Sequence, residues 1–459
     1  MSSSERGSWG SRAGFILAAA GSAVGLGNIW GFPTKVGQGG GAVFVLVYLF
    51  CVFFICAPIL IAEMALGRGS ERDPMGAYRF YRPNSSWWIV GGMGILCGVG
   101  ILSFYSVIAG WTLAYIFYSL TGAVSGTEQQ IADFFNRFTA NGPLNVFLTF
   151  LFIAGTAAAI LGGVRSGIER ATKIMMPALF VILVLLAGYA LTLPGASQGL
   201  AYYLRPDFSL ALKPAVFNAA LGQAFFSLSL GMGCLITYGS YLAKNESIGS
   251  SALWVVSLDT SVALLAGFVV FPTGFSIPGF DPSASGPGLI FSVLPRLFTT
   301  MPGGTLFGVA FFILLALAAF TSTISLLEVP VSHFIDEHRW TRKKAVGVLA
   351  LVSFVLSIPS ALGNGYVPAL TNFVSPFWGG NFLGLMARIW NDFALPIGGF
   401  LTALFVGYVW RTENALKELT REGTWFPYPA LWSFLIRFVS PVAIAFIIVA
   451  TLWPLFFPA

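Results

Sequence analysis

The sequence predicts an all-α integral membrane protein with about 11 transmembrane helices, arranged as an inverted five-helix repeat (helices 1–5 and 6–10) with discontinuous helices 1 and 6. The composition is 56% hydrophobic and only 9% charged, whereas soluble domains carry about 25% charged residues. Apolar stretches of about 20 residues, the length that crosses a bilayer, recur along the chain. Glycine-rich interruptions break the first and the sixth of these stretches.

Eleven apolar segments follow one another along the chain. They lie at approximately residues 12–36, 41–67, 87–120, 145–163, 168–194, 215–242, 250–275, 304–335, 345–362, 382–409 and 429–456. We therefore expect a single transmembrane domain, with repeat one at approximately 12–194, repeat two at approximately 215–409 and an additional helix at approximately 429–456. The first segment is too long to be the apolar region of a cleavable signal peptide.

Positive charge is distributed unevenly between the two sides of the predicted membrane. Of the 24 Lys and Arg residues, all but six fall on the side of the N-terminus. The six are Lys35, Arg137, Arg205, Lys213, Arg296 and Arg388. Cytoplasmic loops are enriched in Lys and Arg, so we expect a multi-pass protein of the cell membrane with a cytoplasmic N-terminus and an extracytoplasmic C-terminus. The net charge of +6 follows from this bias and does not indicate nucleic-acid binding.

The two interruptions run from Gly21 to Asn28 and from Ser227 to Gly233. Glycine costs roughly 1 kcal/mol relative to alanine inside a helix. Within a bilayer, irregular backbone persists only where it lines a cavity or is buried in protein. Interrupted segments at corresponding positions of two halves indicate a transport site at the midplane. Half-helix ends are partly positive at the N-terminus and partly negative at the C-terminus, so the site suits a zwitterion and Na⁺.

Several ordered motifs make the chain resemble the neurotransmitter:sodium symporter family, in its bacterial-type form. The motifs are Trp9, Arg12 and the run Asn28 to Pro33; Pro58 to Arg68; Gly110 to Thr112; Gln223 to Tyr241; and Ala318 to Ser322 followed by Ile335 to Glu337. The resemblance extends across all eleven segments. It implies the inverted-repeat fold and the coupling of Na⁺ entry to the uptake of amino acids or related amines.

The resemblance also implies two Na⁺ sites. The first would use the Ala23 carbonyl, Asn28, Ser227, Asp259 and the substrate carboxylate. The second would use the carbonyls of Gly21, Val24 and Ala318 with the hydroxyls of Thr321 and Ser322. Oxygen ligands are the ones that a hard cation prefers, although small hydroxyl residues also serve ordinary helix packing.

Asp259 distinguishes this chain from the chloride-dependent members of the family it resembles. Those members have Asn at this position and bind chloride nearby, and four residues later this chain has Ala263, which offers chloride no hydroxyl. A carboxylate within the membrane is expensive and marks a functional site by default. We therefore expect Asp259 to replace the charge of chloride, so that no chloride is required.

The substrate site implied by the resemblance has three parts. The carboxylate would meet the N–H groups of Leu26 and Gly27 and the Tyr105 hydroxyl, and the amine would meet the carbonyls of Ala23, Phe226 and Ser227. The side-chain pocket would be lined by Ser22, Ile101, Phe226, Ser229, Met232, Ser322 and Leu326. This lining contains no acid or base, so it favours a hydrophobic L-amino acid. The flexible, polarizable Met232 suits a bulky or aromatic side chain.

A structural role and two gates complete the expected set. Glu63 is expected to hydrogen-bond the unwound backbone of the sixth segment, as the neutral acid because burial disfavours the charged form. At the inner end, Arg6 would pair with Asp336, with Trp9 and Tyr241 beside them. At the outer end, Gly31 and Ala387 stand where the family has an Arg and an Asp, so both halves of that ion pair are missing together. Tyr105, Phe226 and packing would then close the outer path, with Lys35 or Arg388 as compensating charges.

These expectations combine into a sodium-coupled secondary-active symporter that imports a hydrophobic or aromatic L-amino acid by alternating access. The alternatives are a symporter of a non-α-amino zwitterion or amine, which the altered outer pair favours, and a non-transporting sensor on the same scaffold. An enzyme is not expected: the chain has no His-Glu-x-x-His motif, and its one Gly-x-Ser-x-Gly match, Gly195 to Gly199, has no preceding strand in a predicted all-α chain and so forms no nucleophile elbow. The four cysteines lie in apolar segments without metal-site spacing, and no pattern indicates an oligomeric state.

Overall fold

The structure is a computed structural model that describes residues 7–210, 213–277, 279–283, 289–295, 298, 302–372 and 380–456. No β-strand occurs within these ranges. In the same ranges, nine helices are long and apolar enough to cross a membrane, and one bent pair of helices forms a further crossing. With the broken segment α12 (Pro214–Ser227) and α13 (Cys234–Gly239), the crossings match the eleven predicted segments.

The first half of the chain supplies five crossings. They are α2 (Arg12–Ala23) with η1 (Gly27–Gly31) and α3 (Phe32–Gln38); α4 (Ala42–Cys51), η2 (Val52–Cys56) and α5 (Ala57–Ser70); α7 (Trp88–Thr121); α9 (Gly142–Leu161); and η3 (Val164–Glu169) with α10 (Arg170–Ala190). Three helices occupy the connections: α6 (Pro74–Tyr81), α8 (Glu128–Thr139) and α11 (Ala196–Leu204). The short helix η4 (Phe208–Leu210) precedes the second half.

The second half begins with the broken pair α12 and α13. It continues with α14 (Ile248–Gly274); η5 (Leu289–Val293); α16 (Gly304–Asp336); α17 (Arg342–Leu362); α18 (Pro368–Thr371); and the composite crossing of α19 (Phe382–Ala387), η6 (Arg388–Ala394), α20 (Leu395–Leu404) and η7 (Phe405–Val409). After α21 (Thr412–Leu419) and η8 (Arg421–Gly423), the last crossing consists of α22 (Pro429–Phe434), η9 (Leu435–Val439) and α23 (Ser440–Phe456).

The first break lies between α2 and η1, and the two parts of this crossing are bent by 51°. Gly25, at the centre of the break, lies where a side chain does not fit: a Cβ there would lie 2.6 Å from Ser322 Oγ and 2.8 Å from Tyr105 Oη. Ordinary carbon contacts are about 3.5–4.0 Å. The glycine therefore lets the backbone of the first crossing approach α16 and α7.

The second break covers residues 228–233, between α12 and α13. Gly231 has a φ of +79°, and a Cβ there would lie 2.2 Å from the carbonyl oxygen of Leu395 in α20. Both the backbone conformation and the space require glycine at this position. The predicted break is thus confirmed, and α20 packs directly against it.

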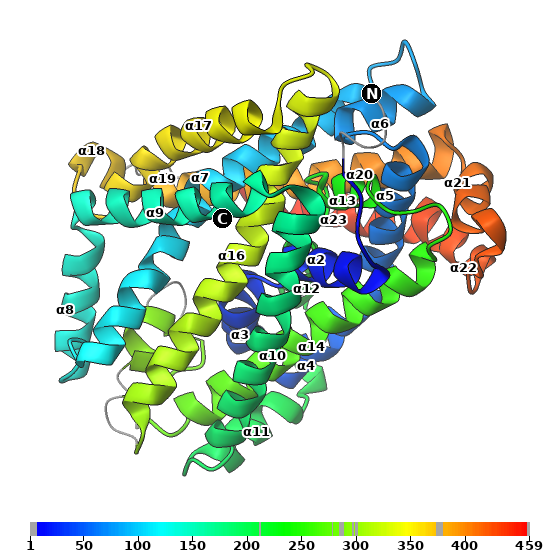
Figure 1. Cartoon of the computed structure of the whole chain (residues 1–459). Helices are drawn as coiled ribbons and strands as arrows, with labels where there is room; N and C mark the ends of the chain where they lie inside the picture. Colours follow the sequence, from blue (N-terminus) through cyan, green and yellow to red (C-terminus); the bar gives the residue numbers. More distant parts are fainter. Residues whose placement is uncertain are drawn as a thin grey trace.

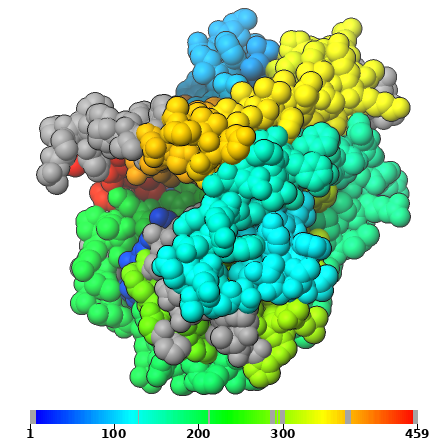
Figure 2. All heavy atoms as spheres, turned by 90° about the vertical axis from the view of Figure 1, so that its left-hand side faces the viewer, coloured from blue at the N-terminus to red at the C-terminus, as the bar shows by residue number. Residues whose placement is uncertain are grey.

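The two broken crossings lie inside the molecule. In Figure 1, α2, α3 and α12 occupy its middle, with α16 running obliquely past them, and α2 contacts α10, α14 and α16. Cyan segments around α8 and α9 lie at the front of the face in Figure 2, below the yellow to orange segment around α17, and only a small patch of the dark blue that marks the first residues is visible. Residues 24–28 and 228–233 are all buried, so both breaks are enclosed by the other helices.

Candidate functional site

The two breaks border a pocket with about 330 Å³ of empty space. Its lining consists of Ser22, Ala23, Gly25, Gly27, Ile101, Tyr105, Phe226, Ser227, Ser229, Met232, Ser322 and Leu326. Eleven of these residues belong to the predicted substrate set, and Gly25 is an addition.

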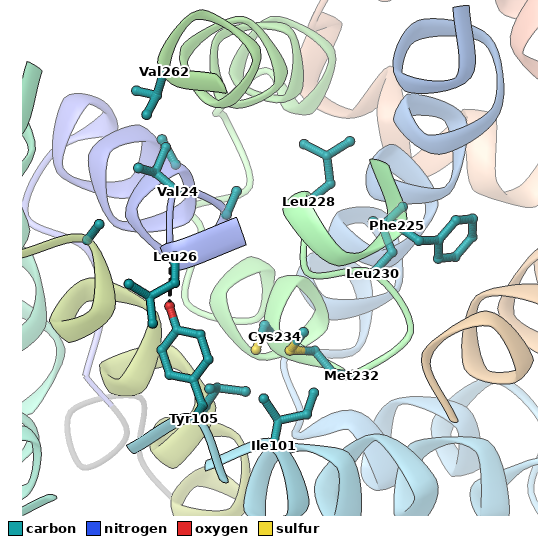
Figure 3. Packing of buried hydrophobic residues seen from close by; sticks show 14 of the residues in the cluster. Val24, Leu26, Ile101, Tyr105, Phe225, Leu228, Leu230, Met232, Cys234 and Val262 are labelled. Carbon is teal, nitrogen blue, oxygen red and sulfur yellow. Dashed lines mark hydrogen bonds between the residues drawn. The ribbon is translucent and has the colours of Figure 1, made fainter. Parts of the chain in front are cut away.

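Helix periodicity explains how α7 and α16 contribute to the pocket. Ile101 and Tyr105 are four residues apart on α7, and Ser322 and Leu326 are four apart on α16. Residues at this spacing share one face of a helix. Figure 3 shows Ile101 and Tyr105 rising from α7 towards the first break, with Met232 approaching from the second.

Leu26 takes part through its backbone. Its N–H donates a hydrogen bond to Tyr105 Oη at 2.9 Å, which is drawn as a dashed line in Figure 3, while its side chain is buried away from the lining. The first break frees this N–H from the helical pattern, because the N-terminal N–H groups of a helix segment have no partner within it. The structure therefore brings together the backbone donor and the tyrosine that the sequence places at the substrate carboxylate.

Asn28, Ser227 and Asp259 form one polar cluster beside the pocket. Asn28 Nδ2 donates to Asp259 Oδ1 at 2.7 Å and to Ser227 Oγ at 2.9 Å. Ser227 Oγ lies 3.0 Å from both carboxylate oxygens of Asp259. All three side chains are buried. Ala23 lines the adjoining pocket, so the residues expected at the first Na⁺ site are assembled from α2, η1, α12 and α14.

Two residues that the sequence argument missed support this cluster. Tyr48 on α4 is fully buried, close enough to interact with Asp259 and Ser227. Gln223, one turn before Ser227, donates from Nε2 to the Gly27 carbonyl at 2.8 Å. Its spacing of four residues from Ser227 was the available signal. Ala263, one turn after Asp259, is fully buried and supplies no polar atom from its side chain.

A second cluster of oxygen atoms lies between α2 and α16. Ser322 Oγ is 3.2 Å from the Val24 carbonyl and 3.3 Å from the Ala318 carbonyl. Thr321 Oγ1 is 3.0 Å from the Ala318 carbonyl and 3.4 Å from that of Val24. Gly21 is adjacent, since a Cβ there would lie 3.2 Å from Thr321 Cβ. The residues expected at the second Na⁺ site therefore converge, and their oxygen atoms are ligands of the kind that Na⁺ prefers.

Glu63 on α5 lies at the second break. Its Oε1 accepts a hydrogen bond from the Gly231 N–H at 2.8 Å, and the side chain is fully buried. This is the contact that the sequence argument expected. It satisfies a backbone donor that the left-handed conformation of Gly231 exposes.

At the end of the molecule that carries the N-terminus, Trp9 packs onto the end of α13. Trp9 Nε1 donates to the Tyr238 carbonyl at 3.0 Å, and its ring lies 6.3 Å from that of Tyr241. Asp336 Oδ2 accepts from the Asp73 N–H at 2.9 Å. Arg6, the expected partner of Asp336, lies outside the described residues.

Two buried acids at this end were missed in the sequence. Glu169 accepts hydrogen bonds from the Gly10 N–H at 2.6 Å and the Ser11 hydroxyl at 3.0 Å, so it holds the segment that leads into α2. Glu328 on α16 accepts from the Tyr241 hydroxyl at 2.9 Å and pairs with Arg342. Glu328 stands in an apolar stretch, where a charged residue is the available signal, whereas Glu169 is followed directly by Arg170 and gives no such signal.

A second, wider cavity of about 760 Å³ lies on the other side of Phe226, which lines both spaces. Lys35, Gln223, Asn391 and Asp392 are among its walls, and Asp392 is close enough to Lys35 and Arg388 to feel their charge. Gly31 and Ala387, which stand where the family has an Arg and an Asp, are both absent from the lining of this cavity. The acid at this level is Asp392. Asp392 lies within the π-helical stretch Arg388–Ala394.

The comparisons with known proteins agree with this geometry. The profile of the sodium:neurotransmitter symporter family matches residues 6–132 and 127–456. The chain belongs to this family. An uncharacterized sodium-dependent transporter of Bacillus subtilis (strain 168), YhdH, is 37% identical over 95% of both chains. An uncharacterized sodium-dependent transporter of Haemophilus influenzae is 33% identical over 98% of this chain and 99% of its own.

Membership in this family confirms the expected fold class, and the family is one of transporters and not of enzymes. The crystal structure of MhsT in complex with L-phenylalanine superimposes with a TM-score of 0.89, at 44% identity, over 97% of this chain and all of the other. The chain is therefore a multi-pass, sodium-dependent symporter with the inverted five-helix repeat and two discontinuous helices. The family and its fold, both expected from the sequence, are confirmed.

Proposed function

We propose that this family member imports a hydrophobic or aromatic L-amino acid together with Na⁺. The observation that carries the proposal is the pocket between the two breaks. Its lining contains no acidic side chain, and the two clusters of oxygen atoms lie beside it. The L-phenylalanine bound to MhsT, at 44% identity, supports the same substrate class.

The two ends of the substrate would meet opposite half-helix ends. The Leu26 N–H and the Tyr105 hydroxyl are 2.9 Å apart at the N-terminal end of η1, where partial positive charge favours a carboxylate. The last carbonyls of α12, at Phe226 and Ser227, end at the same pocket. Partial negative charge there favours an ammonium group. An α-amino acid presents both groups at once.

We assign two Na⁺ ions to the two oxygen clusters. Asp259 would provide the first ion with a full negative charge inside the protein, and Ala263 offers chloride no hydroxyl in its place. The resulting site is neutral without chloride, so transport is expected to be independent of chloride. The chain would divide into repeat one at approximately 12–194, repeat two at approximately 215–409 and an additional helix at approximately 429–456. Each ion site would then take residues from both repeats.

Alternating access would open this pocket to one side at a time. With the N-terminus in the cytoplasm, the 760 Å³ cavity is the outer path and Phe226 separates it from the substrate. Lys35 and Asp392 are the opposite charges on its walls, so their approach would help to close it. On the inner side, release of Trp9 from Tyr238 would free α2 and open the path to the cytoplasm.

The test is uptake of labelled L-amino acids into proteoliposomes that contain the full chain. Uptake is measured under three conditions: with an inward Na⁺ gradient, with K⁺ replacing Na⁺, and with gluconate replacing chloride. Accumulation of phenylalanine, tryptophan or leucine that requires Na⁺ and ignores chloride is the expected result. Failure to accumulate any amino acid, in a preparation that still binds Na⁺, would reject the substrate class and favour an amine or a sensor.

A further inference from the structure

Arg437 is the only charged residue in the sequence of the last membrane crossing, Pro429–Trp453. It lies on η9, eight residues after Pro429 and therefore about 12 Å along the helix axis from it. A charged side chain in a membrane-spanning helix is expensive, and it almost always pairs with another charge or with a carbonyl group. The surroundings of this arginine therefore have to supply a partner.

The described part of the chain does not supply that partner. There, Arg437 forms no ion pair and donates no hydrogen bond from its side chain, and its Nε is buried without an acceptor. The rings of Tyr408 and Phe438 each lie 5.6 Å from the guanidinium carbon. These cation–π contacts hold the guanidinium in place, but they leave its five N–H donors without acceptors.

The guanidinium of Arg437 lies near one boundary of the membrane, on the outer surface of the protein. Tyr408 is the last residue but one of the tenth crossing, Phe382–Val409, and its hydroxyl donates to the Arg437 carbonyl at 2.7 Å. Tyr408 and Phe438 are 47% and 49% exposed, on the surface where a membrane protein meets lipid. Side chains on a helix lean towards its N-terminus, so Arg437 leans towards Pro429 and the headgroups at that boundary.

Two further arginines stand at the same end of the tenth crossing. Arg82, which follows α6, donates from Nη2 to the Val409 carbonyl at 2.9 Å, and Arg411 comes two residues after Val409. Both are exposed, and neither forms an ion pair with a described residue. Glu413, the acid that follows them in α21, pairs with none of the three arginines. The end of this crossing therefore carries net positive charge.

We propose that the arginine patch of Arg82, Arg411 and Arg437 binds the headgroup of an anionic phospholipid, with the lipid phosphate on Arg437. A phosphate accepts the N–H groups that the protein leaves unpaired, and its oxygens match the guanidinium fork. The acyl chains pack on the exposed rings of Phe434 and Phe438, four residues apart on one helix face. A zwitterionic lipid has the same phosphate, but its ammonium group faces two unpaired arginines. The patch therefore selects a lipid of net negative charge.

The test counts the lipids bound to the full chain by native mass spectrometry. The protein is purified in detergent, freed of lipid, and titrated with phosphatidylglycerol or with phosphatidylcholine that has the same acyl chains. The first phosphatidylglycerol is expected to bind about tenfold more tightly or better, the range for a hydrogen bond to a charged group. Equal affinities for the two lipids would overturn the proposal. Inorganic phosphate should not displace the bound lipid, and displacement would assign the patch to a soluble anion instead.

Arg437→Gln then locates the preference. It keeps a long polar side chain and removes the charge, so the advantage of phosphatidylglycerol should disappear. The matched control is Arg137→Gln, which removes an exposed arginine from α8, across the molecule from α21 and α22 in Figure 1, and should preserve the advantage. A preference that survives in Arg437→Gln, in protein that unfolds at the temperature of the parent, would refute the site. If this variant does not fold, the exposed Arg82→Gln should weaken phosphatidylglycerol binding severalfold, and an unchanged affinity there would refute the site as well.

Discussion

Replacing Asp259 by Asn tests whether a protein carboxylate supplies the charge of the first Na⁺ site. The substitution keeps the shape of the side chain and an oxygen at the position of Oδ1. That oxygen can still accept hydrogen bonds from Asn28 Nδ2 and Ser227 Oγ, which lie 2.7 Å and 3.0 Å from Asp259 Oδ1 in the unaltered protein. It removes one negative charge and puts an amide NH₂ at the position of Oδ2. The hydrogen bonds to Oδ1 are therefore held constant while the charge changes.

The expected effect is large because the side chain is fully buried. Two unit charges about 4 Å apart attract by about 4 kcal/mol at an effective dielectric constant of about 20, and every 1.4 kcal/mol is about tenfold in affinity. We expect the Na⁺ concentration for half-maximal amino-acid binding to rise by between about tenfold and about a thousandfold. Part of this loss should be recovered by chloride, which can supply the missing charge.

The assay is a Na⁺ titration of labelled amino-acid binding to the purified protein, in chloride and again in gluconate. Asp259→Asn combined with Ala263→Ser adds a hydroxyl one turn away and should depend on chloride more strongly than the single variant. Asp133→Asn, an exposed carboxylate on α8, is the control and should change nothing. A Na⁺ requirement unaltered by Asp259→Asn, with no response to chloride, would refute the role given to this carboxylate.

Three further predictions concern the substrate, the second ion and the outer path. Tyr105→Phe removes the hydroxyl that accepts the Leu26 N–H, so amino-acid affinity should fall by about ten- to a hundredfold, the range for a hydrogen bond to a charged group; unchanged equilibrium binding would contradict this. Thr321→Val keeps the shape and removes an oxygen of the second cluster, so uptake should need about tenfold more Na⁺ or more, and a normal Na⁺ titration would exclude it as a ligand. Lys35→Asp and Asp392→Lys should each slow uptake several-fold, whereas the double exchange should recover part of it; a double variant no better than either single one would separate the two residues.

The positions of the crossings and of the breaks were readable from the sequence. Spanning a bilayer requires about 20 apolar residues, and this is a local property of the chain, so the predicted segments agree with the helices to within a few residues. The glycines Gly25 and Gly231 indicated the breaks in the sequence, and in the structure neither position has room for a side chain. The chemistry of the site was also visible in part, because a carboxylate in an apolar segment, such as Asp259 or Glu63, is rare and energetically expensive.

The tertiary structure alone decided how distant residues meet. Asp392, in the π-helical stretch Arg388–Ala394, lines the wider cavity together with Lys35, and no pattern in the sequence indicated this meeting. Tyr48, Gln223 and Glu328 acquire partners only through helices far apart in the chain. The sequence by itself therefore determined which segments cross the membrane, where two of them break and which atoms could bind an ion. Backbone conformation and helix packing determined which of those atoms converge. Hydrogen bonds and packing contacts form only between atoms a few ångströms apart, and the order of residues along the chain does not give those distances.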